Sequence, residues 1–286
     1  MNREPLIDPH GGAERLRIDG DGIRFAGLIW PATGRGPGSG RQVVLLHGVQ
    51  NCAVTMVRIA RAMAADGWRC SALDMPGHGM TRWLDGADDD ARYGRDNVVR
   101  LVGAAMATIA DRPVVIGHSW GGDTALAMAA AGADLEHAIL IDPPAMSRPE
   151  YEAMAEREVA ELRPGDMPAA RAVVDAAGLI TDPLDREAKA EALTLASGVA
   201  IGAVFRAEGS WRPIDDVRRW SALERRAPVD IIAGEPEAGG LLPDSVIADL
   251  RALMGGDRVQ VLTGAGHSPQ RTDFERFWPL LRAVLG

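Results

Sequence analysis

Several kinds of residue are scarce in this 286-residue sequence, and each scarcity excludes a class of protein. Two cysteines, Cys52 and Cys70, are too few for a disulfide framework. No apolar run is long enough to span a bilayer, and the first eight residues lack the apolar core of a signal peptide. We therefore expect a cytoplasmic protein with no membrane partner.

Basic residues are also in the minority, with 31 Lys and Arg against 40 Asp and Glu. The resulting net charge of -9 argues against nucleic acid as a partner. Lys189 is the only lysine, which we interpret as compositional bias. A hydrophobic share of 47% and a charged share of 25% are typical of a globular protein with a substantial core.

Short apolar runs alternate with helical patterns over most of the chain. Residues 14–30 predict two short strands around a Gly/Asp turn. The buried-strand signals that follow lie at 43–46, 68–73, 114–117, 137–141, 229–233 and 259–263. Strands that alternate with helices predict an α/β fold with a doubly wound, mostly parallel sheet of about eight strands.

The alternation is interrupted between residues 145 and 225. Helix-forming composition appears there at 150–162, 169–177, 186–197 and 214–224. We therefore predict a core formed by 1–144 and 226–286, and a helical cap inserted at 145–225. The acidic stretch at 85–96 is interpreted as a solvated loop.

The clearest chemical signal is Gly117-His-Ser-Trp-Gly121, which lies between a buried strand and a helical pattern. This is the context of a nucleophile elbow, in which Ser119 sits on a strained turn with its hydroxyl exposed. The alternative is an ordinary serine N-cap. The flanking strand and helix favour the elbow.

A serine nucleophile needs a base, and the base needs an orienting carboxylate. His267 follows the last strand, at the sheet edge where the elbow also lies. His47 and His78 end strands at the same edge and are interpreted as holding turns in place. His118, beside the serine, should point away from it.

Two carboxylates compete for the orienting role. Glu237 follows the strand at 229–233, and Asp142 ends the strand at 137–141. Both lie at the expected edge of the sheet. We prefer Glu237 and keep Asp142 as the alternative acid, because Asp142 with the two prolines after it can simply end a strand.

The oxyanion of acyl transfer needs fixed donors, which backbone N–H groups supply. Trp120 follows the nucleophile and Val49 follows the strand at 43–46, so these two are the expected donors. Gln50 is a further candidate. The expected substrate-binding residues are Trp120, Gln50, Met75 and Met146, with Trp211, Met154 and Phe205 as cap candidates. We see no convergent basic cluster.

Five motifs together resemble the α/β-hydrolase fold family, in its cap-bearing form with a serine nucleophile. They are His47-Gly48, Asp74–Gly79, Gly117–Gly122, Gly234-x-x-Glu237 and Gly266-His267. Their order, nucleophile then acid then histidine, is the order of that family. The family more often has Asp where this chain has Glu237.

The resemblance implies hydrolysis through a covalent acyl-Ser119 intermediate, without a metal or cofactor. A carboxylic ester, thioester or lactone is the expected substrate class, in the form of a small, mainly apolar molecule. The alternatives are a C–C bond hydrolase or acyltransferase that uses the same triad, or a non-catalytic ligand-binding protein of the same fold. Serine at position 119 argues against epoxide hydrolases and haloalkane dehalogenases, which resemble this fold but use aspartate there.

Overall fold

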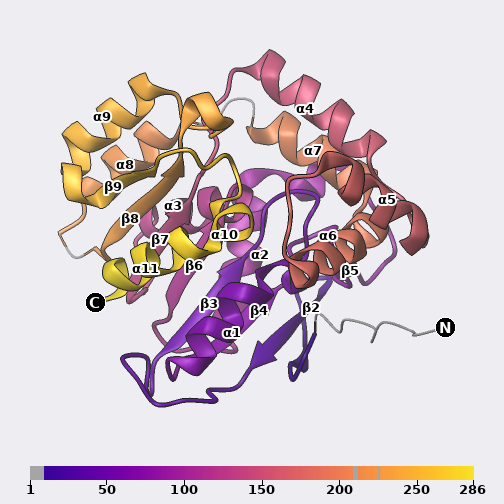
Figure 1. The fold of residues 1–286 in the computed structure, drawn as a ribbon, viewed down its shortest axis with the longest axis horizontal. Coiled ribbons are helices and arrows are strands. Elements are labelled where there is room, and N and C mark those ends of the chain that lie inside the picture. Colours follow the sequence, from indigo (N-terminus) through magenta and orange to yellow (C-terminus); the bar gives the residue numbers. More distant parts are fainter. Residues whose placement is uncertain (1–9, 209–211, 225) are drawn as a thin grey trace.

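A computed structural model describes residues 10–208, 212–224 and 226–286 (Figure 1). In these ranges, nine strands form one sheet in the order β1-β2-β4-β3-β6-β7-β8-β9, and β5 pairs with β2. The strands are β1 (Glu14–Gly20), β2 (Ile23–Trp30), β3 (Gln42–Leu46), β4 (Arg69–Leu73), β5 (Arg82–Trp83), β6 (Val114–His118), β7 (His137–Ile141), β8 (Val229–Gly234) and β9 (Val259–Leu262).

The sheet is parallel from β4 to β9 and antiparallel at β1, β2 and β5. This confirms the predicted α/β architecture. Within β3, Val43 and Leu45 belong to one hydrophobic cluster, whereas Val44 and Leu46 belong to another. Successive side chains of a strand point to opposite faces, so a continuous apolar run is what a strand covered on both faces requires.

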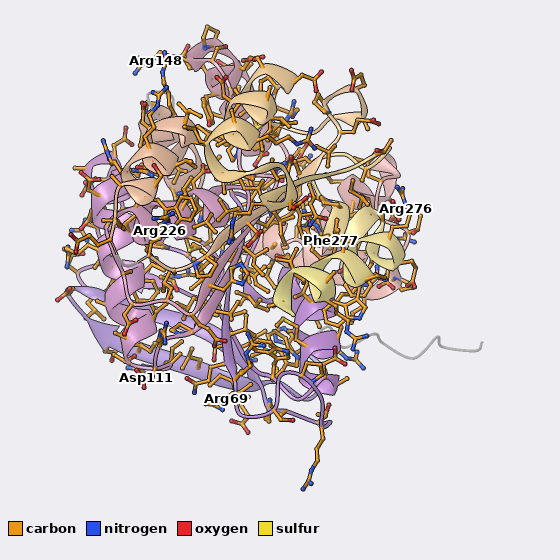
Figure 2. The ribbon with its side chains drawn as sticks, turned by 90° about the vertical axis from the view of Figure 1, so that its left-hand side faces the viewer. Arg69, Asp111, Arg148, Arg226, Arg276 and Phe277 are labelled. Atoms are coloured by element: carbon orange, nitrogen blue, oxygen red, sulfur yellow. The ribbon has the colours of Figure 1, made fainter. Side chains whose placement is uncertain are left out.

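Helices cover both faces of this sheet (Figure 1). One hydrophobic cluster includes residues of α2, α3 and α9, and the other includes residues of α1 and α11. On α11, Phe277 is buried and its neighbour Arg276 reaches the surface (Figure 2). The helices are α1 (Val57–Ala65), α2 (Arg95–Ala107), α3 (Trp120–Ala130), α9 (Asp244–Met254), α10 (Pro269–Thr272) and α11 (Phe274–Leu285). Short 3-10 helices lie at η1 (Ala53–Met56), η2 (Asp90–Tyr93), η3 (Pro236–Ala238) and η4 (Gly256–Arg258).

Five further helices lie between β7 and β8: α4 (Arg148–Ala160), α5 (Met167–Ala177), α6 (Pro183–Leu195), α7 (Gly198–Glu208) and α8 (Pro213–Ser221). We call α4 to α7 the inserted helices, because α4 packs against α7 and α5 against α6 at one end of the sheet (Figure 1). By contrast, α8 packs against α3 and α9. The sequence patterns did not predict α7, which is largely buried and therefore lacks an amphipathic pattern.

Local capping explains where the inserted helices begin. Ser147 and Glu150 form a capping box at the start of α4. The Asp166 carboxylate accepts from Ala169 N at 3.0 Å, and the Asp182 carboxylate accepts from Leu184 N at 2.9 Å. Each carboxylate satisfies a backbone donor that its helix leaves free.

The acidic stretch at 85–96 is not simply a solvated loop, as the sequence suggested. It contains η2, and Tyr93 is buried. The Asp88 carboxylate accepts hydrogen bonds from Tyr93 Oη and from Ser197 Oγ, the latter at 2.5 Å. Because Ser197 directly precedes α7, this contact ties the acidic stretch to the inserted helices.

No single helix in the described ranges has the length and apolar character to cross a membrane. One sharply bent pair, Pro183–Leu195 with Gly198–Ala207, meets that test by length and composition only.

The backbones of β3, β6 and α3 approach one another so closely that no side chain fits between them. A Cβ on Gly121 would lie 2.3 Å from Leu46 O, and a Cβ on Gly117 would lie 2.1 Å from Gly121 O. A Cβ on Gly48 would lie 2.9 Å from Ser119 Cβ. Only glycine allows these approaches, so the end of β3 lies directly against the turn that carries Ser119.

We predict that Gly121→Ala lowers the free energy of unfolding by about 2 to 4 kcal/mol, because the new methyl group meets backbone atoms that cannot move independently. Gly103→Ala, in α2, is the matched control. Its nearest neighbour would be Met128 Cε at 4.0 Å, so it should raise stability by up to about 1 kcal/mol. Urea unfolding followed by circular dichroism measures both, and equal effects would contradict the packing argument.

Candidate active site

Ser119 lies between β6 and α3 in a strained backbone conformation. Its φ is 54° and its ψ is -123°, a combination that costs a non-glycine residue about 1 to 3 kcal/mol. Ser119 N donates to Ile141 O at 2.9 Å, which ties the turn to the end of β7. This is the local geometry that the G-x-S-x-G motif predicts.

His267 follows β9 and contacts a buried carboxylate. Its Nδ1 lies 2.7 Å from Oδ2 of Asp142, whose side chain is fully buried. Asp142 also accepts from Gly234 N at 2.9 Å and from Leu241 N at 3.0 Å. A carboxylate that accepts from Nδ1 fixes the proton on that nitrogen, so Nε2 is left as an acceptor.

Glu237 lies elsewhere. It is an exposed residue of η3, and no hydrogen bond connects it with His267 in the part of the chain that the structure describes. The backbone after β8 turns back at Gly240, whose N–H bonds Glu235 O at 2.9 Å. This turn directs two N–H groups toward Asp142 and carries Glu237 outward. The geometry favours Asp142 over Glu237, the reverse of the order that the sequence suggested.

Three other histidines near the site are buried and support the backbone. Nε2 of His47 accepts from Met75 N at 2.9 Å, and Nε2 of His78 accepts from Gln50 N at 3.2 Å, as expected for residues that hold turns. His118 Nε2 donates to His267 O at 2.8 Å, a supporting contact that the sequence did not reveal. Burial lowers the pKa of His78 to about 4, and holds the pKa of His47 and His118 well below the usual value.

Val49 and Trp120 present backbone N–H groups beside Ser119. Trp120 is the first residue of α3, so its N–H has no partner within the helix. Val49 follows Gly48, which contacts Ser119. Neither N–H donates to any acceptor among the described residues. Both N–H groups are therefore without a protein acceptor in the described chain, as an oxyanion hole requires.

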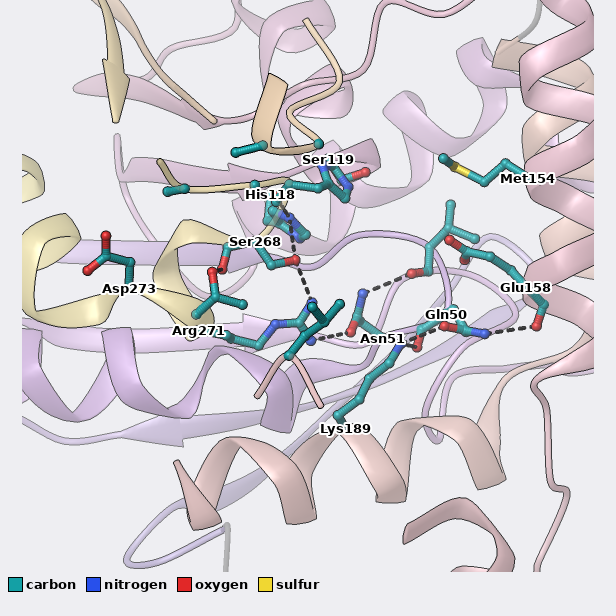
Figure 3. A pocket seen from close by; sticks show the side chains of 18 of the residues that line it. Gln50, Asn51, His118, Ser119, Met154, Glu158, Lys189, Ser268, Arg271 and Asp273 are labelled. Atoms are coloured by element: carbon teal, nitrogen blue, oxygen red, sulfur yellow. Dashed lines mark hydrogen bonds between the residues drawn. The ribbon is translucent and has the colours of Figure 1, made fainter. Parts of the chain in front are cut away.

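Ser119 and His267 line one cavity of about 560 Å³ (Figure 3). Val49 and Gln50 form part of its wall, and the inserted helices contribute Met154 from α4 and Phe205 from α7.

Three of the expected substrate-binding residues lie outside this lining, so far as the described chain shows. Trp120 is buried, and its ring centroid lies 5.3 Å from that of His78. Met75 is fully buried and belongs to the same hydrophobic cluster as Trp120. Met146 packs against that cluster. Trp211 lies outside the described residues.

Gln50 connects the cavity wall to the inserted helices. Its Nε2 donates to Glu158 O at 2.8 Å and to Glu161 Oε2 at 3.0 Å. Lys189 Nζ donates to Gln50 O at 2.9 Å and to Gln50 Oε1 at 2.6 Å. Both side-chain N–H groups are used, so in this conformation Gln50 supplies no additional oxyanion donor.

The cavity also contains charged residues that the sequence analysis missed. Lys189 of α6, Arg271 of α10 and Glu158 of α4 all line it, although we saw no convergent basic cluster in the sequence. The available signal was Lys189, the single lysine of the chain. No group of three or more His, Cys, Asp and Glu side chains suited to a metal occurs within the described ranges.

The model of the Alpha/beta hydrolase family matches residues 43–279 of this chain. A comparison with curated protein sequences gives no match. The family match includes the elbow, the carboxylate and the histidine described above.

Solved structures share the fold at low sequence identity. An E-2-(acetamidomethylene)succinate hydrolase has a TM-score of 0.76 and 20% identity, over 95% of this chain and 97% of that one. An N-formylmaleamic acid deformylase from Pseudomonas putida S16 has a TM-score of 0.71 and 21% identity, over 94% and 100%. An N-acyl homoserine lactonase complexed with N-hexanoyl homoserine lactone has a TM-score of 0.69 and 19% identity, over 95% and 97%.

We predict that the imidazoles of His47, His78 and His118 stay neutral in the folded protein down to about pH 5.5, because burial disfavours their charged forms. NMR chemical shifts of their ring nuclei should stay constant between about pH 7.5 and 5.5. The same residues in urea-unfolded protein should titrate near pH 6.5. A folded-state midpoint near 6.5 for any of the three would contradict the burial argument.

Proposed function

The chain belongs to the alpha/beta hydrolase family, and on that premise we propose that this hydrolase cleaves acyl compounds through a covalent Ser119 intermediate. The observation that carries the proposal is the 2.7 Å contact between His267 and Asp142, with His267 lining the same cavity as Ser119. This contact supports Asp142, in place of Glu237, as the orienting acid that we propose.

In the proposed acylation, Ser119 Oγ attacks the substrate carbonyl and Nε2 of His267 takes the hydroxyl proton. Asp142 holds the imidazole in the required tautomer and stabilises the imidazolium that forms. The negative oxygen of the tetrahedral intermediate binds the N–H groups of Val49 and Trp120. His267 then returns the proton to the leaving group, and the acyl-Ser119 ester remains.

Water completes the cycle in the proposed deacylation. His267 takes a proton from the water, the hydroxide attacks the acyl carbonyl, and the same two N–H groups stabilise the second oxyanion. Collapse of this intermediate returns the proton to Ser119 Oγ and releases the acid. These groups are fixed before substrate arrives, which is what makes electrostatic stabilisation effective.

A carboxylic ester, thioester or lactone is the substrate class that we propose. One of the structural neighbours is a lactonase by name, which is compatible with this class. A second hollow of about 330 Å³ shares Glu158, Lys189 and Arg271 with the reaction cavity, and part of its wall is apolar, with Val174, Ile180 and Leu193. It offers room for an apolar part of the substrate.

We also propose that the inserted helices form a cap over the core. Met154, Lys189 and Phe205 come from these helices and line the cavity. The packing of α8 against α3 and α9 supports ending the cap before residue 213, earlier than the sequence suggested.

A fluorophosphonate probe should label the wild-type protein but not Ser119→Ala, because only the serine oxygen can displace the probe's fluoride. Gel fluorescence or intact mass measures the adduct. Equal labelling of both proteins would show that another residue is the nucleophile. Labelling without turnover of any ester would favour the acyltransferase or C–C hydrolase alternatives.

Asp142→Asn and Glu237→Gln form a matched pair that tests the orienting acid. Asp142→Asn should lower kcat on an activated aryl ester by about 10³- to 10⁴-fold, because an amide no longer favours the catalytic tautomer. Glu237→Gln, at an exposed position, should change kcat by less than about 2-fold. The opposite pattern would restore Glu237 as the acid.

A further inference from the structure

Two cations lie in the wall of the reaction cavity. Lys189 comes from α6 and Arg271 from α10, and both line the hollow that contains Ser119 and His267. Figure 3 shows Asn51 between them. The chain contains 31 basic residues, and its single lysine is at this position.

Among the described residues, neither cation lies within ion-pair distance of a carboxylate. The ion pairs found among the described residues include neither Lys189 nor Arg271, whereas Arg58, close by, pairs with Asp185 at 3.1 Å. Arg271 Nη1 donates to Asn51 Oδ1 at 2.7 Å, and Nη2 donates to Ser268 Oγ at 2.9 Å. These acceptors are neutral, so they orient the guanidinium without balancing its charge.

Donor capacity is left over on both side chains. Arg271 is only 7% exposed, yet its Nε has no hydrogen-bond partner within the described structure. The Lys189 ammonium has three N–H groups, and its recorded acceptors are two atoms of Gln50. Each Nη of Arg271 also carries a second N–H beyond the one bound by Asn51 or Ser268, so the guanidinium keeps donor capacity that its neutral partners do not use.

Carboxylates lie near this pair, but none is within ion-pair distance among the described residues. The charges of Glu158 and Glu161 act on Lys189, and that of Asp185 acts on Arg271. Asp273 is already paired with Arg276 at 2.7 Å. Glu158 faces the cavity with Oε2 unpartnered among the described residues, and burial raises the pKa of its carboxyl. Glu161 accepts from Gln50. Among the described residues no carboxylate hydrogen-bonds either cation, which leaves those positions for a ligand carboxylate.

We infer that the substrate carries, besides its scissile acyl group, a carboxylate that binds between Arg271 and Lys189. A guanidinium and a carboxylate match as planar partners, and charge-assisted hydrogen bonds in a shielded site are strong. The cations also line the junction with the apolar hollow described above. We place this carboxylate on the acyl part, so the inferred substrate is a monoester or monothioester of a dicarboxylic acid. This inference rests on the proposed hydrolase function and extends it.

Two aryl esters of equal acyl length test this inference. Mono-4-nitrophenyl glutarate has a free carboxylate, and 4-nitrophenyl pentanoate has none. Wild type should prefer the glutarate ester in kcat/KM. Arg271→Gln and Lys189→Gln should each lower the ratio of kcat/KM for the glutarate ester to kcat/KM for the pentanoate ester by about 10- to 100-fold. Lys189→Gln also loses its bonds to Gln50, so it should slow both esters in addition. Arg271→Lys, which keeps the charge, should retain part of the preference.

Arg282→Gln is the matched control, since Arg282 lies outside the cavity and pairs with Asp66 at 2.8 Å. Arg282→Gln should leave kcat/KM unchanged for both esters. Thermal unfolding identifies any variant that fails to fold. Equal losses on the two esters in well-folded Arg271→Gln and Lys189→Gln would overturn the inference, as would a wild type that prefers the pentanoate ester.

A binding measurement separates this inference from the proposed function. Calorimetry on Ser119→Ala should detect glutarate but not neutral glutaramide, and adding Arg271→Gln should weaken glutarate binding by about 10-fold or more. The binding result does not depend on turnover. Fluorophosphonate labelling, in turn, does not depend on a carboxylate in the substrate. Equal labelling of wild type and Ser119→Ala would therefore refute the nucleophile without touching the anion site, and absence of selective glutarate binding would refute the anion site without touching the nucleophile.

Discussion

The contact between the end of β3 and the turn after β6 is the constraint on which the rest of the site depends. Gly48 and Gly121 allow two backbones to meet where any side chain would collide. The contact holds the turn that carries Ser119 against the end of β3 and so brings the residues before Val49 next to Ser119. The strain at Ser119 is small against the cohesion of a sheet buried on both faces.

The sequence was sufficient to predict the sheet, the elbow and His267, because each depends on local pattern and on the shared edge of parallel strands. It was not sufficient to predict that His267 contacts Asp142 and not Glu237. Both residues follow strands that end at that edge, and the difference lies in where Gly234 N and Leu241 N point. That direction depends on the turn after β8, which no local pattern encodes.

The charge of the cavity was hidden from the sequence for a related reason. Lys189 and Arg271 lie on different helices, and neither belongs to a motif. The folded chain brings both residues into the wall of one cavity. A search for basic clusters along the sequence therefore does not find them. Burial likewise concealed α7, since a helix covered on most sides has no amphipathic period.

The hydrogen bonds of Gln50 have a consequence for how the chamber admits a molecule. Gln50 directly follows Val49, and its side chain holds both α4 and α6. Any outward swing of either helix must break these bonds and free the residue next to the oxyanion donor. The bonds that join α4 and α6 at the cavity wall thus also fix the residue that follows Val49 in the chain.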